Sequence, residues 1–308
     1  MTIDIVLATY NGAPYLASQI DSLLAQGYTD WRLLLRDDCS NDTTPLFLEK
    51  YAERYPHKIS LLPSGERKGA MANFGTLLEQ TTAPYVMFCD QDDLWDRDKI
   101  ALTLAKMHSL EKTMGKETPL LVHTDLRVVD RYLHPIAPSF WRYAHLYPEK
   151  TVTLAQLMTQ NVVTGCTSLV NRALLQRGLP LPEEAIMHDW WFALVATAVG
   201  AVGIVDKDTI AYRQHAHNVL GAKRFCWNGL KTAWKRRKVM AENKRKQAEA
   251  LKRRLREELS LDQQAIIDTY LALHTLSFWK SRYLTLRHHF FKQGLTRRLA
   301  SLLFLKQP

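Results

Sequence analysis

The sequence predicts an α/β protein with a mostly parallel β-sheet flanked by helices. Over about the first 100 residues, short β-branched apolar segments alternate with segments that have helical spacing, and this alternation is typical of parallel sheets. Several apolar segments are followed directly by polar residues, as expected where strands end at a ligand-binding edge. The chain has 308 residues, of which 46% are hydrophobic and 23% charged, so it can bury a sizeable core.

Four apolar segments have the length and composition of buried strands. They span residues 3–8, 31–35, 59–62 and 85–89. The spacing of apolar residues between them predicts helices over 15–25, 44–55 and 71–80, with Asn41-Asp42-Thr43-Thr44 capping the second. Later segments predict short strands at 120–123, 167–170, 204–205 and 209–212, and a helix over 189–199.

The charge is unevenly distributed along the chain. Residues 1–221 hold 20 Lys/Arg and 25 Asp/Glu, a net charge of −5, whereas residues 222–308 hold 21 and 6, a net charge of +15. The last part also has helical spacing with repeated basic runs. We therefore predict an α/β domain over 1–221 and a basic, amphipathic helical extension over 222–308, with an anionic partner for the extension.

The anionic partner can be a lipid surface or a nucleic acid. Aromatic residues such as Phe278, Trp279, Phe290 and Phe291 suit a membrane interface. Alternatively, these apolar residues pack on the α/β domain or in a homodimer interface. No recognisable nucleic-acid-binding motif accompanies the basic runs, so we expect no nucleic acid partner.

Cysteine usage and hydropathy indicate the compartment. The four cysteines, Cys39, Cys89, Cys166 and Cys226, are far apart and none has CxxC spacing, as expected for thiols in a reducing compartment. The N-terminus lacks the basic segment of a signal peptide. No uncharged apolar stretch reaches the roughly 18–20 residues that span a bilayer. We expect a cytoplasmic protein, either soluble or peripherally attached to the inner face of the cell membrane.

Three carboxylates crowd the end of the predicted strand 85–89. Asp90, Asp92 and Asp93 follow it within four positions, and such crowding is costly without a cation. Hard oxygen ligands suit Mg²⁺ or Mn²⁺, which can bridge protein and diphosphate oxygens. The tripeptide DxD is common, so the cluster alone leaves open a solvated acidic turn in which Asp93 or Asp96 caps a helix.

Polar residues also follow the first two predicted strands. Asp37 and Asp38 can accept hydrogen bonds from a pyrimidine N–H or a ribose hydroxyl, and the alternative is a turn that caps the next helix. Within Thr9-Tyr10-Asn11 the aromatic ring can lie against a base, and the alternative is a plain turn at the strand end.

Two constellations lie later in the chain. In His188-Asp189-Trp190-Trp191 an acid at the start of a helix is a candidate general base in a half-buried pocket. The alternative is a helix N-cap with tryptophans in the core. In Arg213-Gln214-His215 a cation and an imidazole can bind diphosphate or complete a metal shell, and the alternative is a surface loop.

The order and spacing of these motifs over about residues 1–221 resemble those of family 2 glycosyltransferases of the GT-A fold. More narrowly, four stretches are similar to bacterial rhamnosyltransferases that build cell-wall rhamnan and O-antigen from dTDP-L-rhamnose. These stretches are DQDDLW (90–95), TQNVVTGCTSLV (159–170), MHDWW (187–191) and YRQHAHNVLGA (212–222). The combination of motifs is specific, although each motif alone is not.

The resemblance implies a role for each residue. Asp189 would be the catalytic base, and Asp92 with His215 would hold Mn²⁺ or Mg²⁺ on the diphosphate. The residue before Asp189 is His188, where the wider family has Glu, which leaves the role of His188 open. The implied donor-binding residues are Thr9, Tyr10, Asn11, Asp37, Asp38, Asp90, Gln91 and Arg213. The implied residues around the acceptor or behind the site are His188, Trp190, Trp191, Thr164 and Gly165.

The implied reaction is inverting transfer of L-rhamnose from dTDP-β-L-rhamnose to a lipid-linked saccharide, because a single base and no protein nucleophile are required. A family 2 transferase that uses another nucleotide sugar is the alternative. A nucleic-acid-binding protein is the alternative from another class, and it leaves the acidic strand ends unexplained. A sugar nucleotidyltransferase would need a Gly-rich basic loop after the first strand, which Thr9-Tyr10-Asn11-Gly12 does not supply.

Overall fold

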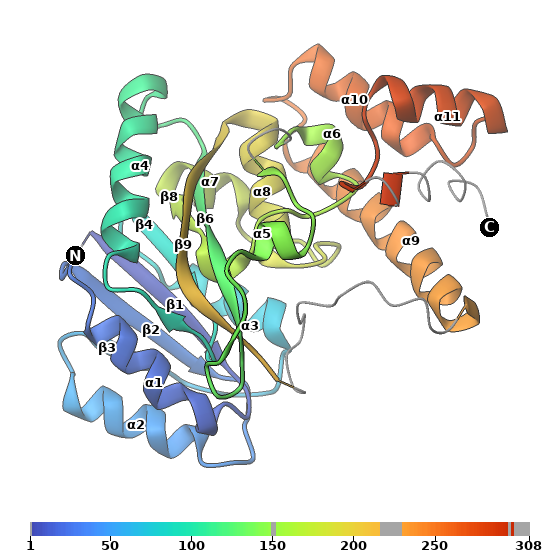
Figure 1. Ribbon diagram of the computed structural model, residues 1–308. Coiled ribbons are helices and arrows are strands. Elements are labelled where there is room, and N and C mark those ends of the chain that lie inside the picture. Colours follow the sequence, from blue (N-terminus) through green and yellow to red (C-terminus); the bar gives the residue numbers. More distant parts are fainter. Residues whose placement is uncertain (1, 149–151, 216–229, 295–296, 299–308) are drawn as a thin grey trace.

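The computed structural model describes residues 2–148, 152–215, 230–294 and 297–298. Within these residues one sheet of nine strands has the order β3-β2-β1-β4-β8-β6-β9-β5, with β7 paired to β6 (Figure 1). The strands are β1 Ile3–Thr9, β2 Trp31–Asp37, β3 Ile59–Leu62, β4 Tyr85–Cys89, β5 Leu94–Trp95, β6 Leu120–Asp130, β7 Pro135–Ala137, β8 Leu169–Asn171 and β9 Ala201–Gln214.

Helices lie on both faces of this sheet (Figure 1). Between the strands they are α1 Ala13–Leu24, α2 Thr44–Arg54, α3 Ala70–Glu79, α4 Lys99–Met114, α5 Phe140–Tyr143, α6 Leu154–Leu157, the 3₁₀ turn η2 Gly165–Thr167, α7 Arg172–Gly178 and α8 His188–Val199. After β9 they are α9 Leu230–Arg254, α10 Leu261–Ala272 and α11 Phe278–Arg287.

Strands β1 to β4, the first four along the chain, are parallel to one another, as predicted. Strand β1 pairs in parallel with β2, where Thr9 lies opposite Asp37, and with β4, where Leu7 lies opposite Cys89. Strand β3 adds in parallel to β2. Because parallel strands end at the same edge, the loops after β1, β2 and β4 meet there, and the polar residues that follow these strands are brought together.

The second half of the sheet is mixed. Strand β8 is antiparallel to both β4 and β6, while β6 and β9 are parallel. The prediction of two short strands at 204–205 and 209–212 was wrong, since β9 is continuous from Ala201 to Gln214. Exposed Asp206 and Lys207 interrupt its apolar pattern, but two register shifts on β6 keep the strands paired across the interruption.

Two apolar clusters cover the two faces of the sheet. On one face Ile5 and its neighbours pack against α1 and α4. On the other face Val6, Val86 and Phe88 pack against α3 and α8. Side chains along a strand alternate between faces, so consecutive residues of β1 enter different clusters. Burial of each such Val, Ile, Leu or Phe stabilises the fold by about 1.5–3 kcal/mol.

The C-terminal helices pack against the rest of the chain (Figure 1). Leu251 and Leu255 of α9 belong to the same apolar cluster as α8. Several cations in the described part of α9 contact the protein: Arg253 pairs with Glu184 at 2.8 Å, and Arg254 donates to the carbonyl of Leu179 at 2.6 Å. These basic residues therefore do not form an unpaired stripe on α9. The predicted boundary between 221 and 222 lies outside the described residues.

The four aromatic residues assigned to an interface divide into two pairs. Phe290 and Phe291 are buried, at 2% and 7% exposure, and the ring of Phe290 lies 5.4 Å from that of Tyr270. Their assignment to a membrane interface was wrong, and the alternative, packing within the protein, holds for both. Phe290 packs with residues of α6 and α10, and the guanidinium of Arg298 lies 3.9 Å from the ring centroid of Phe291. Phe278 and Trp279 are exposed. Within the described residues, no helix has both the length and the apolar character needed to cross a membrane.

Candidate active site

A cavity of about 590 Å³ opens at the sheet edge where β1, β2 and β4 end. It contains ten of the residues singled out from the sequence: Thr9, Tyr10, Asp38, Asp90, Gln91, Asp92, Thr164, Gly165, His188 and Asp189. The loops after three parallel strands, the turn η2 and the start of α8 therefore build one site. Six predicted residues do not line it: Asn11, Asp37, Arg213, His215, Trp190 and Trp191.

Asp37 and Asn11 stabilise the loops at the edge of the cavity. The carboxylate of Asp37 is buried and accepts hydrogen bonds from Thr9 Oγ1 at 2.9 Å and from the Ser40 N–H at 2.8 Å. Asn11, in the left-handed region at φ 49°, accepts the Asn41 N–H through its side chain at 3.0 Å. Both residues join the β1 loop to the β2 loop.

Asp38 faces the cavity and also holds a loop that the sequence reasoning missed. Its carboxylate accepts the backbone N–H groups of Lys68 and Gly69 at 2.7 and 2.8 Å. This brings the guanidinium of Arg67 over the ring of Tyr10, 4.0 Å from the ring centroid. Arg67 and Tyr10 both line the cavity and together form a flat cationic and aromatic surface.

Gln91 clamps the backbone at the end of β1. Its side-chain oxygen accepts the Tyr10 N–H at 2.9 Å, and its side-chain nitrogen donates to the Tyr10 carbonyl at 3.1 Å. A Cβ at Gly12 would lie 2.3 Å from Gln91 Oε1, so this approach requires glycine. The acidic loop after β4 is thereby fixed to the loop after β1.

Asp92 meets His215 at the other end of the acidic loop. Oδ2 of Asp92 lies 2.8 Å from Nε2 of His215, and the imidazole stacks on Tyr15 with ring centroids 4.6 Å apart. A carboxylate oxygen and an imidazole nitrogen are ligands that suit Mn²⁺. This donor set fits the divalent cation that the sequence implies, with the largely buried Asp92 lining the cavity and His215 behind it.

Arg213 holds the acidic loop in place. Its N–H donates to Asp93 Oδ1 at 3.1 Å, and its guanidinium donates to the carbonyl oxygens of Asp92 and Arg131 at 2.8 and 2.9 Å. Asp93 does not cap a helix, because the next helix begins only at Lys99. The sequence predicted a donor-binding arginine, whereas these contacts join β9 to the loop after β4.

Crowding strongly affects the protonation of the acidic loop. Burial, followed by the neighbouring carboxylate of Asp92, raises the pKa of Asp90 to about 7. Burial, with Asp92 and Asp90 beside it, raises the pKa of Asp93 well above its usual value. A divalent cation on this loop would lower these pKa values, since it favours the ionised carboxylates.

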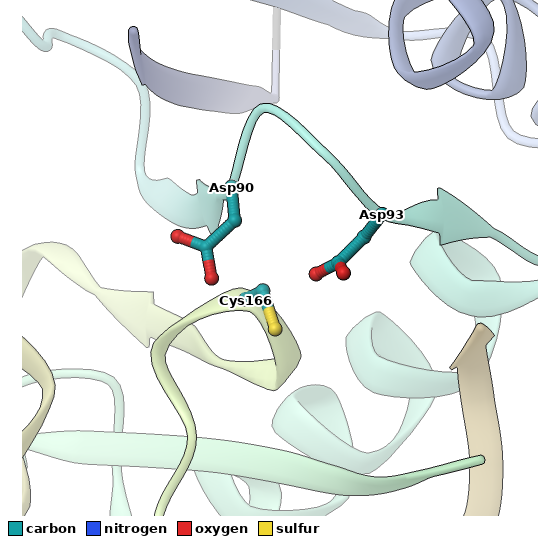
Figure 2. Close-up of side chains that lie close together, drawn as sticks. All are labelled: Asp90, Asp93 and Cys166. Atoms are coloured by element: carbon teal, nitrogen blue, oxygen red, sulfur yellow. The ribbon is translucent and has the colours of Figure 1, made fainter. Parts of the chain in front are cut away.

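Asp90 and Asp93 also lie close to the thiol of Cys166, which belongs to η2 (Figure 2). Ligand atoms of the three residues lie within 4.8 Å of one another. Burial raises the pKa of the Cys166 thiol well above its usual value, and a thiol binds metals as the thiolate. Hard cations also prefer oxygen to sulfur. The Asp92–His215 pair is therefore the better candidate for the metal position.

Asp189, the second residue of α8, lines the same cavity as the acidic loop. Its Oδ1 accepts the Trp190 N–H at 2.7 Å, and its Oδ2 accepts Nδ2 of Asn161 at 3.2 Å. Burial raises the pKa of Asp189 to about 6. A carboxylate with this pKa is ionised at neutral pH and still basic enough to accept a proton. Asn161 also lines the cavity. The sequence analysis did not single it out, although it lies within the stretch 159–170 that resembles rhamnosyltransferases.

His188 lies beside Asp189 as a neutral ring in an aromatic setting. Its centroid is 4.0 Å from that of Phe74 and 4.8 Å from that of Phe88. Burial lowers the pKa of His188 to about 3, and neither ring nitrogen has a hydrogen-bond partner among the described residues. The two tryptophans point elsewhere, since their indole N–H groups donate to the carbonyls of Leu157 and Gly178.

The sequence and this geometry can be compared with known proteins. The model of glycosyl transferase family 2 matches residues 4–178, more than half of the chain. The chain belongs to glycosyl transferase family 2. TuaG of Bacillus subtilis, named as a teichuronic acid biosynthesis glycosyltransferase, is 25% identical over 75% of this chain and 85% of its own length. The dTDP-rhamnosyl transferase RfbG of Shigella flexneri is 26% identical over 70% of this chain and 74% of its own length.

Solved structures show the fold of this glycosyltransferase to be of the GT-A type. TarS residues 1–349 of S. aureus align with a TM-score of 0.58 at 17% identity, over 94% of this chain and 72% of that 1–349 chain. The mannosyltransferase PcManGT of Pyrobaculum calidifontis, in complex with GDP-Man and Mn²⁺, aligns with a TM-score of 0.54 at 17% identity, over 99% and 88%. The family match includes the acidic loop and Gly165, while Asp189 and His215 lie beyond it.

Proposed function

We propose that this glycosyltransferase moves L-rhamnose from dTDP-β-L-rhamnose to a lipid-linked saccharide, with inversion, during bacterial surface polysaccharide synthesis. The observation that carries the proposal is the convergence of Asp189 and the Asp90–Asp92 loop on one cavity. Transfer from a nucleotide sugar requires a base and a group of residues that binds the diphosphate, and both are present in this cavity. The relationship to RfbG, a dTDP-rhamnosyl transferase, supports rhamnose as the sugar.

The nucleotide occupies the end of the cavity formed by the β1 and β2 loops. We assign the thymine to the surface of Tyr10 and Arg67, because an aromatic ring under a guanidinium can stack a flat base. Asp38 supports this position through the backbone N–H groups of Lys68 and Gly69. Asp90, which lines the cavity next to this end, is assigned to the ribose.

Asp92 and His215 would hold the Mn²⁺ or Mg²⁺ ion. When bound, the ion offsets the negative charge that develops on the departing diphosphate. Arg213 keeps both ligands at this point, because it joins the end of β9 to the acidic loop.

Asp189 removes the proton from the acceptor hydroxyl. The acceptor oxygen then attacks the anomeric carbon from the face opposite the diphosphate, the bond to the diphosphate breaks, and its electron pair leaves with the nucleotide. One base suffices for this single displacement, so the β-linked donor gives an α-linked product. Asn161 donates a hydrogen bond to Asp189 and keeps the carboxylate oriented.

Another nucleotide sugar is the second candidate. WfgD of Escherichia coli, a UDP-Glc-dependent glucosyltransferase by name, is 30% identical over 105 residues, which is 34% of this chain. The aligned residues support a nucleotide-binding site but do not indicate which sugar is transferred. In this proposal the 1–221 domain carries the reaction, and the 222–308 extension serves the membrane-held acceptor.

A donor panel tests the proposal. Purified protein with Mn²⁺ would be incubated with dTDP-L-rhamnose, UDP-glucose, UDP-GlcNAc or GDP-mannose and a lipid-linked GlcNAc or rhamnosyl acceptor. We expect a mass-spectrometric product only with dTDP-L-rhamnose, and an α linkage by NMR. Thermal stabilisation should likewise be larger with dTDP than with UDP or GDP at equal concentration. Transfer only from a UDP-sugar would establish the second candidate, and retention of the donor's anomeric configuration would exclude a single displacement.

A further inference from the structure

Helix α11 has its polar and apolar sides reversed relative to an ordinary surface helix. Ser281 and Thr285 are fully buried against the protein. Four of the five large apolar side chains of the helix are exposed: Phe278 50%, Trp279 80%, Tyr283 59% and Leu286 47%. A surface helix normally buries its large apolar residues and exposes its polar ones. A helix that exposes its large apolar residues is expected to bind a partner through that exposed side.

The exposed residues form one continuous surface, here called the aromatic face, made of Phe278, Trp279, Tyr283 and Leu286. Positions 279, 283 and 286 follow each other at the four- and three-residue spacing of one helix side. The rings of Phe278 and Trp279 are also in contact, with centroids 5.2 Å apart. Contiguous exposed apolar patches mark interaction surfaces rather than ordinary protein surface.

The charge around the aromatic face has one sign. From residue 269 to 308 the sequence holds seven Lys/Arg and no Asp or Glu. Lys280 and Arg287 are exposed on α11 itself. Helix α9 differs, because several of its described cations form ion pairs with acids, such as Arg245 with Glu242 at 2.6 Å and Lys252 with Asp268 at 2.5 Å. The partner of α11 should therefore be apolar at its contact and negatively charged around it.

We propose that the aromatic face of α11 docks on an anionic lipid bilayer. Trp and Tyr prefer the boundary between headgroups and acyl chains, and lysines and arginines beside them attract anionic headgroups. The helix has 10 residues, so it lies on the bilayer and does not cross it. Figure 1 shows α11 at the outer end of the molecule, on the side opposite β3, and the side chains of its aromatic face are exposed.

The chain after α11 returns to the cavity and links the docking surface to the active site. Gln293 accepts the Tyr147 N–H at 2.5 Å and donates its own N–H to Gln160 at 2.8 Å. Arg297 donates to the carbonyl of Ala144 at 2.9 Å. Gln160, Ala144 and Arg297 all line the cavity. The segment that follows α11 in the sequence therefore forms part of the cavity wall. An acceptor whose lipid stays in the bilayer can enter the cavity on this side.

This inference rests on the proposed function only for the identity of the acceptor, since docking itself needs no donor. The direct test is sedimentation of the full chain with two kinds of vesicle, phosphatidylglycerol with phosphatidylethanolamine, and phosphatidylcholine alone. The variant is the double substitution Trp279→Ser and Tyr283→Ser. Leu46→Ser is the matched control, because Leu46 is also an exposed apolar residue, at 57%, but lies on α2.

We expect the wild-type chain and Leu46→Ser to bind the anionic vesicles, with weaker binding at higher salt and on phosphatidylcholine. The double variant should bind at least about tenfold more weakly. Both variants should transfer sugar to a water-soluble acceptor as the wild type does, because neither changes a cavity residue. With the vesicle-held acceptor, the double variant alone should be slow.

Three results would overturn the proposal. Equal binding of the double variant and the wild type would remove α11 from the contact. Failure of the wild type to bind anionic vesicles would remove the bilayer as the partner. A wild-type dimer by light scattering that becomes a monomer in the double variant would make a second copy of the chain the occupant of the face. Absence of transfer in every variant, with vesicle binding intact, would instead contradict the proposed function.

Discussion

Nε2 of His215 lies 2.8 Å from Oδ2 of Asp92, although 123 positions separate the two residues in the chain. The contact exists because β9, which pairs with β5, ends beside the last residues of the loop between β4 and β5, and Arg213 joins the two segments through Asp93. Stacking on Tyr15 fixes the plane of the imidazole. These contacts place two potential metal ligands side by side, which reduces the ordering that ion binding would require.

The first prediction concerns this pair. His215→Ala should weaken Mn²⁺ binding at least about tenfold, because one ligand is lost and the carboxylate of Asp92 loses its partner. The measurement is the Mn²⁺ concentration that gives half-maximal thermal stabilisation in the presence of dTDP. His134→Ala is the control, since His134 also pairs with an aspartate, Asp130, but on an exposed strand end. An unchanged Mn²⁺ titration for His215→Ala would remove His215 from the metal site.

The second prediction concerns Asp189 as the base. Asp189→Asn should lower kcat by about 10²- to 10⁴-fold, while stabilisation by dTDP stays near the wild-type value. Burial raises the pKa of Asp189 to about 6, and only the ionised form accepts a proton. The wild-type kcat should therefore rise with pH through about 6 and then level off. Near-normal transfer by a folded Asp189→Asn variant would contradict the assignment.

The hydrogen bond from Asn161 allows a finer test of the same assignment. Nδ2 of Asn161 donates to the ionised carboxylate of Asp189, and this donation lowers the pKa. Asn161→Ala should therefore raise the pKa and move the acid side of the pH profile upward by about half to one pH unit. Asn243→Ala, on α9 and outside the cavity, should leave the profile unchanged. A shift to lower pH in Asn161→Ala would contradict this role.

The sequence predicted the parts whose signal is local. Residues 59–62 and 85–89 were predicted as strands and are confirmed as β3 and β4 with the same bounds, because their apolar runs are uninterrupted and bounded by polar turns. Strand β9 was predicted in two pieces, because exposed Asp206 and Lys207 look like a turn when its pairing with β6 is unknown.

The composition of the site depended on contacts that no local pattern shows. Arg67 reaches Tyr10 only because Asp38 binds the loop before α3. Arg213 was predicted to bind the donor because a basic residue after a strand is compatible with diphosphate. Its observed partners, Asp92 and Arg131, are backbone carbonyls from two distant segments, and such partners become visible only once the chain is folded.

The fourth residue to test is Arg213, which we expect to matter for stability as well as activity. Arg213→Ala removes a buried guanidinium and its hydrogen bonds to the carbonyls of Asp92 and Arg131. The free energy of unfolding should fall by about 2–4 kcal/mol, measured by urea denaturation. Arg97→Ala is the control, because the side chain of Arg97 is exposed. Equal stability of the two variants would show that the guanidinium contacts contribute little to the fold.

The last prediction concerns the close approach of Gly165 to His188. A Cβ at position 165 would lie 2.9 Å from Nε2 of His188 and 3.5 Å from Cβ of Asp189. The imidazole cannot easily move away, because Phe74 and Phe88 pack against it. Gly165→Ala should therefore displace the start of α8 by a few tenths of an ångström and lower kcat by about 10- to 100-fold.

Gly27→Ala is the matched control for this substitution. Its Cβ would lie 3.5 Å from the carbonyl oxygen of Arg97, an ordinary contact away from the cavity. Steady-state kinetics and thermal melting of both variants check the prediction. We expect Gly165→Ala to keep its binding of dTDP, because the β1 and β2 loops are untouched, and to lose turnover. A wild-type kcat in Gly165→Ala would contradict this prediction. It would mean that catalysis does not depend on the exact position of His188 and Asp189 at the start of α8, contrary to what the single-base mechanism requires.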